Sequence, residues 1–86
     1  METLLSKKSV SSVPLSELEV GQTGTITRIE NTGVVSERLA DLGFLPGTTV
    51  SLTRRAPAGD PLCFDIRGSQ MCIRRKEACR IWAERR

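Results

Sequence analysis

Short apolar runs that alternate with polar residues fill the second half of the chain, and they restrict it to a fold built mainly from β-strands. Apolar residues recur at alternate positions within 50–55, 62–67 and 71–73, the period of a half-buried strand. Glycine or proline separates most of these runs, so each strand is short. A β-branched segment at 25–30 predicts an earlier strand, and 80–84 predicts a last one. We therefore expect a small antiparallel barrel of about five strands with one short helix.

The one predicted helix ends before Gly43, a residue that suits the left-handed position after a helix. Ser36 is a favourable N-cap residue. Val35, Leu39 and Leu42 form one apolar stripe at helical spacing. Such a helix has only about two turns, so packing against the sheet is needed to stabilise it.

Proline and glycine mark two turns that we interpret mainly as backbone geometry. Pro46 and Gly47 fit the central positions of a type II turn, whose second central residue needs a positive φ. In the loop at 56–61, prolines flank the glycine and remove backbone N–H donors, so a phosphate-binding loop is not expected. Asp60 is expected to hydrogen-bond within its own turn. The residues assigned to structural turns are Gly43, Pro46, Gly47, Pro57, Gly59, Asp60 and Pro61.

The chain of 86 residues has the length of one small domain with a modest core. Residues 1–12 are rich in serine and lysine with little apolar periodicity, and we interpret them as a mobile N-terminal tail before a single domain at 13–86. The apolar positions that the strand and helix patterns place inside are Ile26, Ile29, Leu39, Leu42, Val50, Leu52, Leu62, Phe64, Ile66, Met71, Ile73, Ala78 and Ile81.

Composition argues against several classes of function. Histidine is absent, which removes the commonest general base and metal ligand, and no catalytic carboxylate pair is identifiable, so an enzyme is not expected. Two phenylalanines and one tryptophan are too few for stacking nucleic-acid bases, and the net charge of +3 is modest. No apolar run is long enough to span a bilayer and no secretory signal is recognisable, so a cytoplasmic protein is expected.

The three cysteines suit a reducing compartment, where they would remain thiols. A hairpin loop at 68–69 would place Asp65 opposite Cys72, with Cys63 diagonal to Cys72, all on the outer face. Two thiolates and a carboxylate can bind a soft divalent metal such as zinc or iron. The alternative, surface thiols without a metal, stays open, and no cofactor is expected to be required.

Two surfaces are candidates for contact with a partner protein. Phe44 and Leu45 would lie at the tip of the turn after the helix, where they would form a small apolar patch. Arg55 and Arg74 are in the strand phase opposite to the apolar positions, where they would attract an acidic surface. The alternative interpretations are a purely geometric turn and an ordinary solvated basic face.

Three segments together resemble the family of ferrous-iron transport protein A (FeoA). Residues 37–48 contain the pattern R-L-x-x-L-G-[LMF]-x-P-G-[ST], and residues 56–62 contain A-P-x-G-D-P-[IL]. Residues 73–78, Ile-Arg-Arg-Lys-Glu-Ala, resemble the L-R-R-x-E-A segment of the family. With a leading segment at 15–26, the resemblance covers about 13–84 in one register.

The resemblance implies an SH3-like barrel in the cytoplasm, at the inner face of the membrane, that binds and modulates the GTPase domain of the ferrous-iron transporter FeoB by protein contact. The chain itself would neither span the membrane nor bind nucleic acid, and a homodimer is retained as an alternative to a monomer. The same module resembles the C-terminal SH3-like domain of iron-dependent repressors. That likeness keeps a second hypothesis open, a metal- or nucleic-acid-responsive regulatory module.

Overall fold

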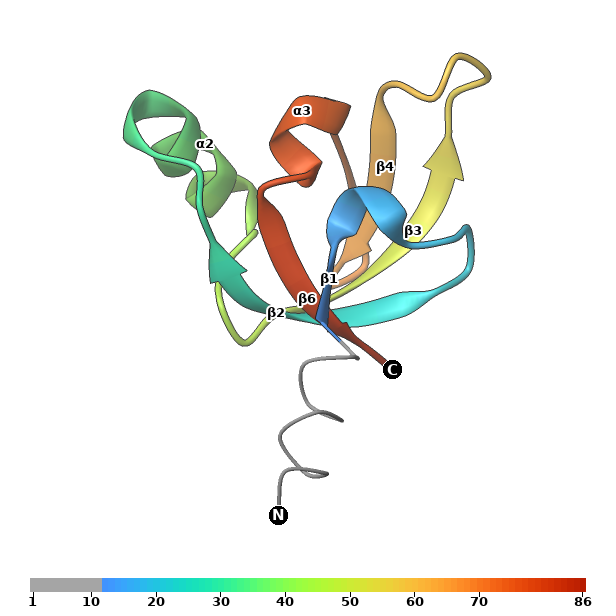
Figure 1. Cartoon of the computed structure of the whole chain (residues 1–86), viewed down its shortest axis with the longest axis horizontal. Coiled ribbons are helices and arrows are strands. Elements are labelled where there is room, and N and C mark those ends of the chain that lie inside the picture. The colour runs from blue at the N-terminus through green and yellow to red at the C-terminus, as the bar shows by residue number, and fades with distance from the viewer. Residues whose placement is uncertain (1–11) are drawn as a thin grey trace.

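The structure is a computed structural model that describes residues 12–86. One six-stranded antiparallel sheet forms most of it (Figure 1). Its strands lie in the order β1-β6-β2-β3-β4-β5. Three short helices, η1 (Leu15–Glu17), α2 (Gly33–Leu42) and α3 (Arg75–Ala78), connect them. The strands are β1 (Ser12–Pro14), β2 (Thr23–Ile29), β3 (Thr49–Arg55), β4 (Leu62–Ile66), β5 (Ser69–Ile73) and β6 (Ile81–Arg85).

The expected mainly-β antiparallel fold is confirmed, and the structure adds elements to it. The sixth strand is β1, in which Val13 pairs with Ala83 of β6. Ser12 therefore belongs to the sheet, and the rest of the predicted tail lies outside the described residues. A short helix, α3, replaces the tight turn that the sequence suggested, because the Glu77 carboxylate accepts a hydrogen bond from the Arg74 backbone N–H at 3.1 Å and fixes its first turn.

Helix α2 begins four residues earlier than the N-cap signal at Ser36 indicated, because its N-cap is Thr32. Thr32 is the extended N-cap residue before it, a favoured type at this position, although its side chain makes no capping hydrogen bond. Its end is well defined. Gly43 has a φ of 105°, and Phe44 N–H donates to the Leu39 carbonyl at 2.9 Å, which is the bond pattern of a Schellman motif.

The hairpin between β4 and β5 turns one residue earlier than predicted. Ile66 pairs with Ser69, and the two loop residues Arg67 and Gly68 have φ values of 53° and 86°. Positive φ at both positions is the geometry of a type I′ turn, which matches the twist of the flanking strands. The predicted loop at 68–69 is therefore wrong, and every strand pairing in this hairpin shifts by two residues while side chains keep their faces.

The core lies inside the curved sheet and includes residues from almost every element. Phe44 and Phe64 pack edge to face at its centre, with ring centroids 5.8 Å apart. Ten of the thirteen predicted core residues are buried, and Ile29, Leu42 and Met71 pack against them while partly exposed. The buried apolar residues outside the predicted core are Val13, Leu15, Leu18, Phe44 and Ala83. Cys63 is also buried, so its predicted exposure on the outer face is wrong.

The two turn segments differ in their partners. Gly47 has a φ of 91°, and Thr48 N–H donates to the Leu45 carbonyl at 3.1 Å, as in a type II turn. In the loop at 56–61, Asp60 does not bond within its own turn as expected. Its carboxylate accepts a hydrogen bond from the Arg75 backbone N–H at 2.9 Å, so it ties the loop to the start of α3.

The left-handed backbone at Gly47 predicts a strain-limited substitution. A Cβ built there meets no heavy atom within 4 Å, so the cost of Gly47→Val comes from the backbone alone. We expect the free energy of unfolding to fall by about 1–3 kcal/mol in urea titrations. The control Thr48→Val, in the same turn at an ordinary φ, should change it by less than about 0.5 kcal/mol. Equal stabilities for both variants would show that the turn relaxes without strain.

Candidate partner-binding site

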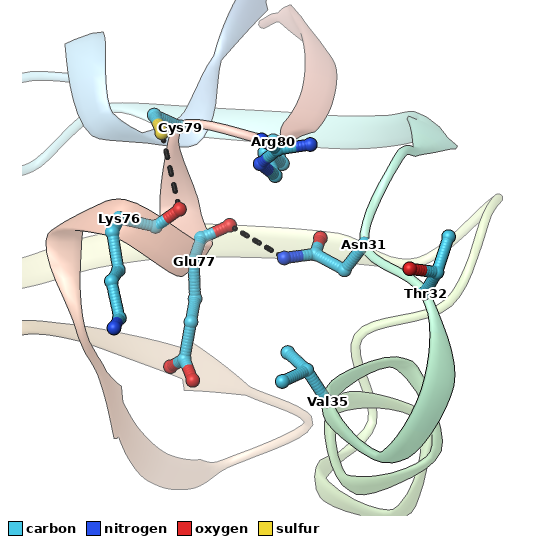
Figure 2. Close-up of a pocket in the computed structure, with 7 residues that line it drawn as sticks. All are labelled: Asn31, Thr32, Val35, Lys76, Glu77, Cys79 and Arg80. Carbon is cyan, nitrogen blue, oxygen red and sulfur yellow. Dashed lines mark hydrogen bonds between the residues drawn. The ribbon is translucent and has the colours of Figure 1, made fainter.

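Helices α2 and α3 lie near each other on one side of the molecule, and the C-terminus lies on the opposite side (Figure 1). Between them is a pocket of about 500 Å³, which we call the α2–α3 groove (Figure 2). The segment between β2 and α2, the first turn of α2, and α3 with the residues after it all contribute. The residues that line the groove are Asn31, Thr32, Val35, Lys76, Glu77, Cys79 and Arg80.

Glu77 holds the two sides of the groove together. It is only 8% exposed, and its carboxylate pairs with the guanidinium of Arg38 from α2. The same carboxylate accepts the Arg74 backbone N–H, and the backbone carbonyl of Glu77 accepts a hydrogen bond from Asn31 Nδ2 at 3.4 Å (Figure 2). A buried carboxylate needs such partners, so α2, the loop before it and α3 are fixed relative to one another.

The exposed part of the groove combines positive charge with aliphatic surface. Lys76 and Arg80 are exposed, and neither has a carboxylate partner among residues 12–86. On the facing helix, Val35 lines the groove and is 37% exposed. Figure 2 shows Val35 across the groove from the Glu77 side chain. An exposed aliphatic side chain beside unpaired cations forms a surface that can contact a partner.

Cys79 places a free thiol in the groove. It is exposed, and its Sγ donates to the Lys76 carbonyl at 3.1 Å (Figure 2). Because the other two cysteines are bonded to each other, Cys79 is the free thiol of the chain.

The predicted apolar patch at the turn after α2 is half wrong. Leu45 is 42% exposed, but Phe44 is fully buried. The Schellman bond turns the residue after Gly43 back over the helix, so Phe44 packs with Leu39, which is also fully buried. Leu45 is left as a single exposed aliphatic side chain, a common surface feature with no functional implication of its own.

The two predicted docking arginines have different environments. Arg55 is half-buried and donates to the Leu18 carbonyl at 2.6 Å, so it holds η1 and is not a solvated docking residue. An irregularity in the pairing of β3 with β4, between Leu52 and Arg54, changes the strand phase and accounts for the error. Arg74 is exposed, as expected, and borders a second pocket of about 310 Å³ on the far side of Glu77.

The three predicted metal ligands do not form a cluster, because two of them are bonded to each other. Cys63 lies directly opposite Cys72, with Cα atoms 4.0 Å apart, and the two form a disulfide. Both sulfurs are therefore unavailable as thiolate ligands, and the expectation that all three cysteines are thiols is wrong for this pair. Asp65 lies opposite Gln70 because of the earlier hairpin turn. Within residues 12–86, no three His, Cys, Asp or Glu side chains are grouped so as to hold a metal ion.

The groove itself was not predicted from the sequence. Val35 was assigned to the buried helix stripe, and the basic residues around α3 were treated as a general solvated face. The pair that builds the groove, Arg38 and Glu77, joins positions 39 residues apart. The S-x-x-E type of capping signal is absent before Glu77, so only its position three residues after Arg74 hinted at the backbone contact.

The curved antiparallel sheet of six short strands with its short connecting helices is a small SH3-like barrel domain. Residues 13–85 match the model of the FeoA domain family, and the chain belongs to that family. The FeoA family is associated with ferrous-iron transport. Among residues 12–86, no helix is both long and apolar enough to cross a membrane.

Known relatives extend the family assignment. The chain is 36% identical over 70 residues to a Fe(2+) transport protein A/Fe(2+) transporter FeoB fusion protein of Porphyromonas gingivalis, covering 81% of this chain and 8% of that protein. The solution structure of FeoA from Chlorobium tepidum is 34% identical, with a TM-score of 0.80, and the match covers 85% of this chain and 70% of that one. FeoA of Stenotrophomonas maltophilia, a prokaryotic SH3 domain protein solved with zinc, is 26% identical with a TM-score of 0.70, covering 81% and 87%.

The Arg38–Glu77 pair predicts non-additive stability effects. Arg38→Met leaves a largely buried carboxylate without its cation and should lower the free energy of unfolding by about 1–3 kcal/mol, towards the low end because Arg38 is 46% exposed. Glu77→Gln should also destabilise the fold. In a double-mutant cycle followed by urea unfolding, the combined variant should lose about 1 kcal/mol less than the sum of the two single losses. Additive losses would show that the pair does not join α2 to α3.

Proposed function

We propose that the chain binds the cytoplasmic GTPase part of a FeoB-type ferrous-iron transporter and modulates it by direct contact. The observation that carries this proposal is the Porphyromonas gingivalis relative, in which a segment similar to this chain is part of the same protein as FeoB. Joining two domains in one chain raises their effective concentration, an arrangement that favours pairs which act in contact.

The chemistry of the described residues supports a contact function. The groove is preformed and presents unpaired cations beside the partly exposed Val35, as a polar rim and an apolar centre do in protein interfaces. The proposed mode of action needs no cofactor and no catalytic group of this chain. It places the chain in the cytoplasm beside its membrane partner. A disulfide is unusual in a reducing compartment, but neither Cys63 nor Cys72 lines the groove, so the proposal does not depend on their redox state.

Binding and GTP turnover test this proposal directly. Isothermal titration of the purified chain into the cytoplasmic GTPase domain of a FeoB-type transporter should give a saturable complex with a dissociation constant on the order of micromolar. GTP turnover by that domain should change when the complex is saturated, whereas the chain alone should turn over no GTP. An unrelated small basic protein serves as the control. Absence of heat and of any change in turnover would refute the proposal.

A further inference from the structure

We propose that the α2–α3 groove is the docking surface, and that it takes an acidic segment of the transporter's cytoplasmic part that presents an aliphatic side chain. This inference rests on the proposed function and names the surface and chemistry through which it would act. It differs from the surfaces suggested by sequence, the turn at Phe44–Leu45 and the strand arginines.

The charge of the groove selects an acidic partner. Lys76 and Arg80 line the groove without a carboxylate partner among the described residues. The one carboxylate lining it, Glu77, is already neutralised by Arg38. Arg74 and Arg75, at the start of α3, are also exposed, so this end of the molecule attracts negative charge.

The apolar side of the groove selects an aliphatic side chain beside that acidic group. Val35, in the first turn of α2, is 37% exposed and is the aliphatic residue that lines the groove. The neighbouring Val34 is 79% exposed but does not line the groove, because consecutive residues of a helix point in different directions. Burial of an aliphatic side chain against Val35 would remove apolar area from water on both partners.

The groove needs little ordering before it can bind. Glu30 N–H donates to the Arg80 carbonyl at 2.8 Å, and Asn31 Nδ2 donates to the Glu77 carbonyl, so the segment leading into α2 is bonded directly to the α3 segment. With the Arg38–Glu77 pair, these contacts preset the spacing of the walls. A preformed site avoids the entropy cost of loop ordering, so more of the contact energy appears as affinity.

A protein segment fits these observations better than an anionic membrane surface. The unpaired cations line a concave pocket, whereas a membrane binds cations that project from a convex or flat face next to a broad apolar surface. One valine in the groove is a small apolar surface for insertion into lipid, but it is sufficient to contact one side chain of a partner. Membrane binding is therefore treated as an outcome of the test.

Charge reversal in the groove provides the first test. The variant Lys76→Glu, Arg80→Glu is compared with Arg54→Glu, Arg85→Glu, which changes net charge equally through two exposed arginines that do not line the groove. Surface-resonance kinetics on the immobilised transporter domain should show at least about tenfold weaker binding for the groove variant at low salt, mainly through slower association. The difference should narrow as salt rises. Lys76→Gln, Arg80→Gln repeats the comparison if the reversed variant does not fold.

Alkylation of Cys79 provides the second test, without any substitution. Without reductant, the disulfide leaves Cys79 as the thiol that N-ethylmaleimide modifies. Saturating transporter domain should slow that modification severalfold, because Cys79 lines the groove.

A substitution of the apolar residue in the groove provides a third test. Val35→Ser should shorten the lifetime of the complex with little dependence on salt.

The outcomes separate this inference from the proposed function. If the chain binds the transporter domain while Cys79 reacts at its free rate and the groove and control variants bind alike, the groove is not the docking surface and the proposed function stands. If the unmodified chain does not bind the domain, both fail. If it binds vesicles of anionic phospholipid and not the domain, the groove is a membrane-binding surface and the proposal is overturned.

Discussion

The α2–α3 groove depends on the interactions of one buried carboxylate, that of Glu77. A charge that is 8% exposed requires compensation, and the protein supplies it from two directions, the Arg38 guanidinium and the Arg74 backbone N–H. Helix α2 has ten residues and would not be stable alone in water. Its position comes from Leu39 and Phe44 in the core on one side and from the Arg38–Glu77 pair on the other.

The same arrangement separates residues that build the groove from residues that are free to bind. Glu77 and Arg38 are occupied by each other, so substitutions there change stability and binding together. The side chains of Lys76 and Arg80 form no ion pair with a carboxylate among residues 12–86, and the Val35 side chain is partly exposed to solvent. Substitutions at these three positions should therefore act on binding while the fold persists.

Sequence reasoning reached the fold more closely than the site because strand periodicity and turn chemistry are local. Alternating residues such as Leu62, Phe64 and Ile66 are buried as predicted. The burial of Phe44 was also accessible, since an apolar residue after a helix-ending glycine commonly packs back on the helix, but a proline turn beside it suggested exposure.

The remaining errors have nonlocal causes. Arg55 turns towards η1 because of an irregularity in β3 that no residue type announces, and Asp60 bonds to α3, which is fifteen positions away. The groove depends on a pair 39 positions apart, so its residues could not be assembled from spacing. The resemblance to FeoA indicated the family, whereas the α2–α3 groove is visible only in the structure.

The most direct test of this account is to observe where the partner touches the chain. Amide spectra of the ¹⁵N-labelled protein, recorded while the transporter's cytoplasmic domain is added, report each backbone position separately. The account predicts that shifts and broadening concentrate at residues 31–35 and 76–80, with the β1–β6 edge unchanged. Perturbation centred on β1 and β6, or on the turn at Leu45, with those two segments unaffected, would contradict it.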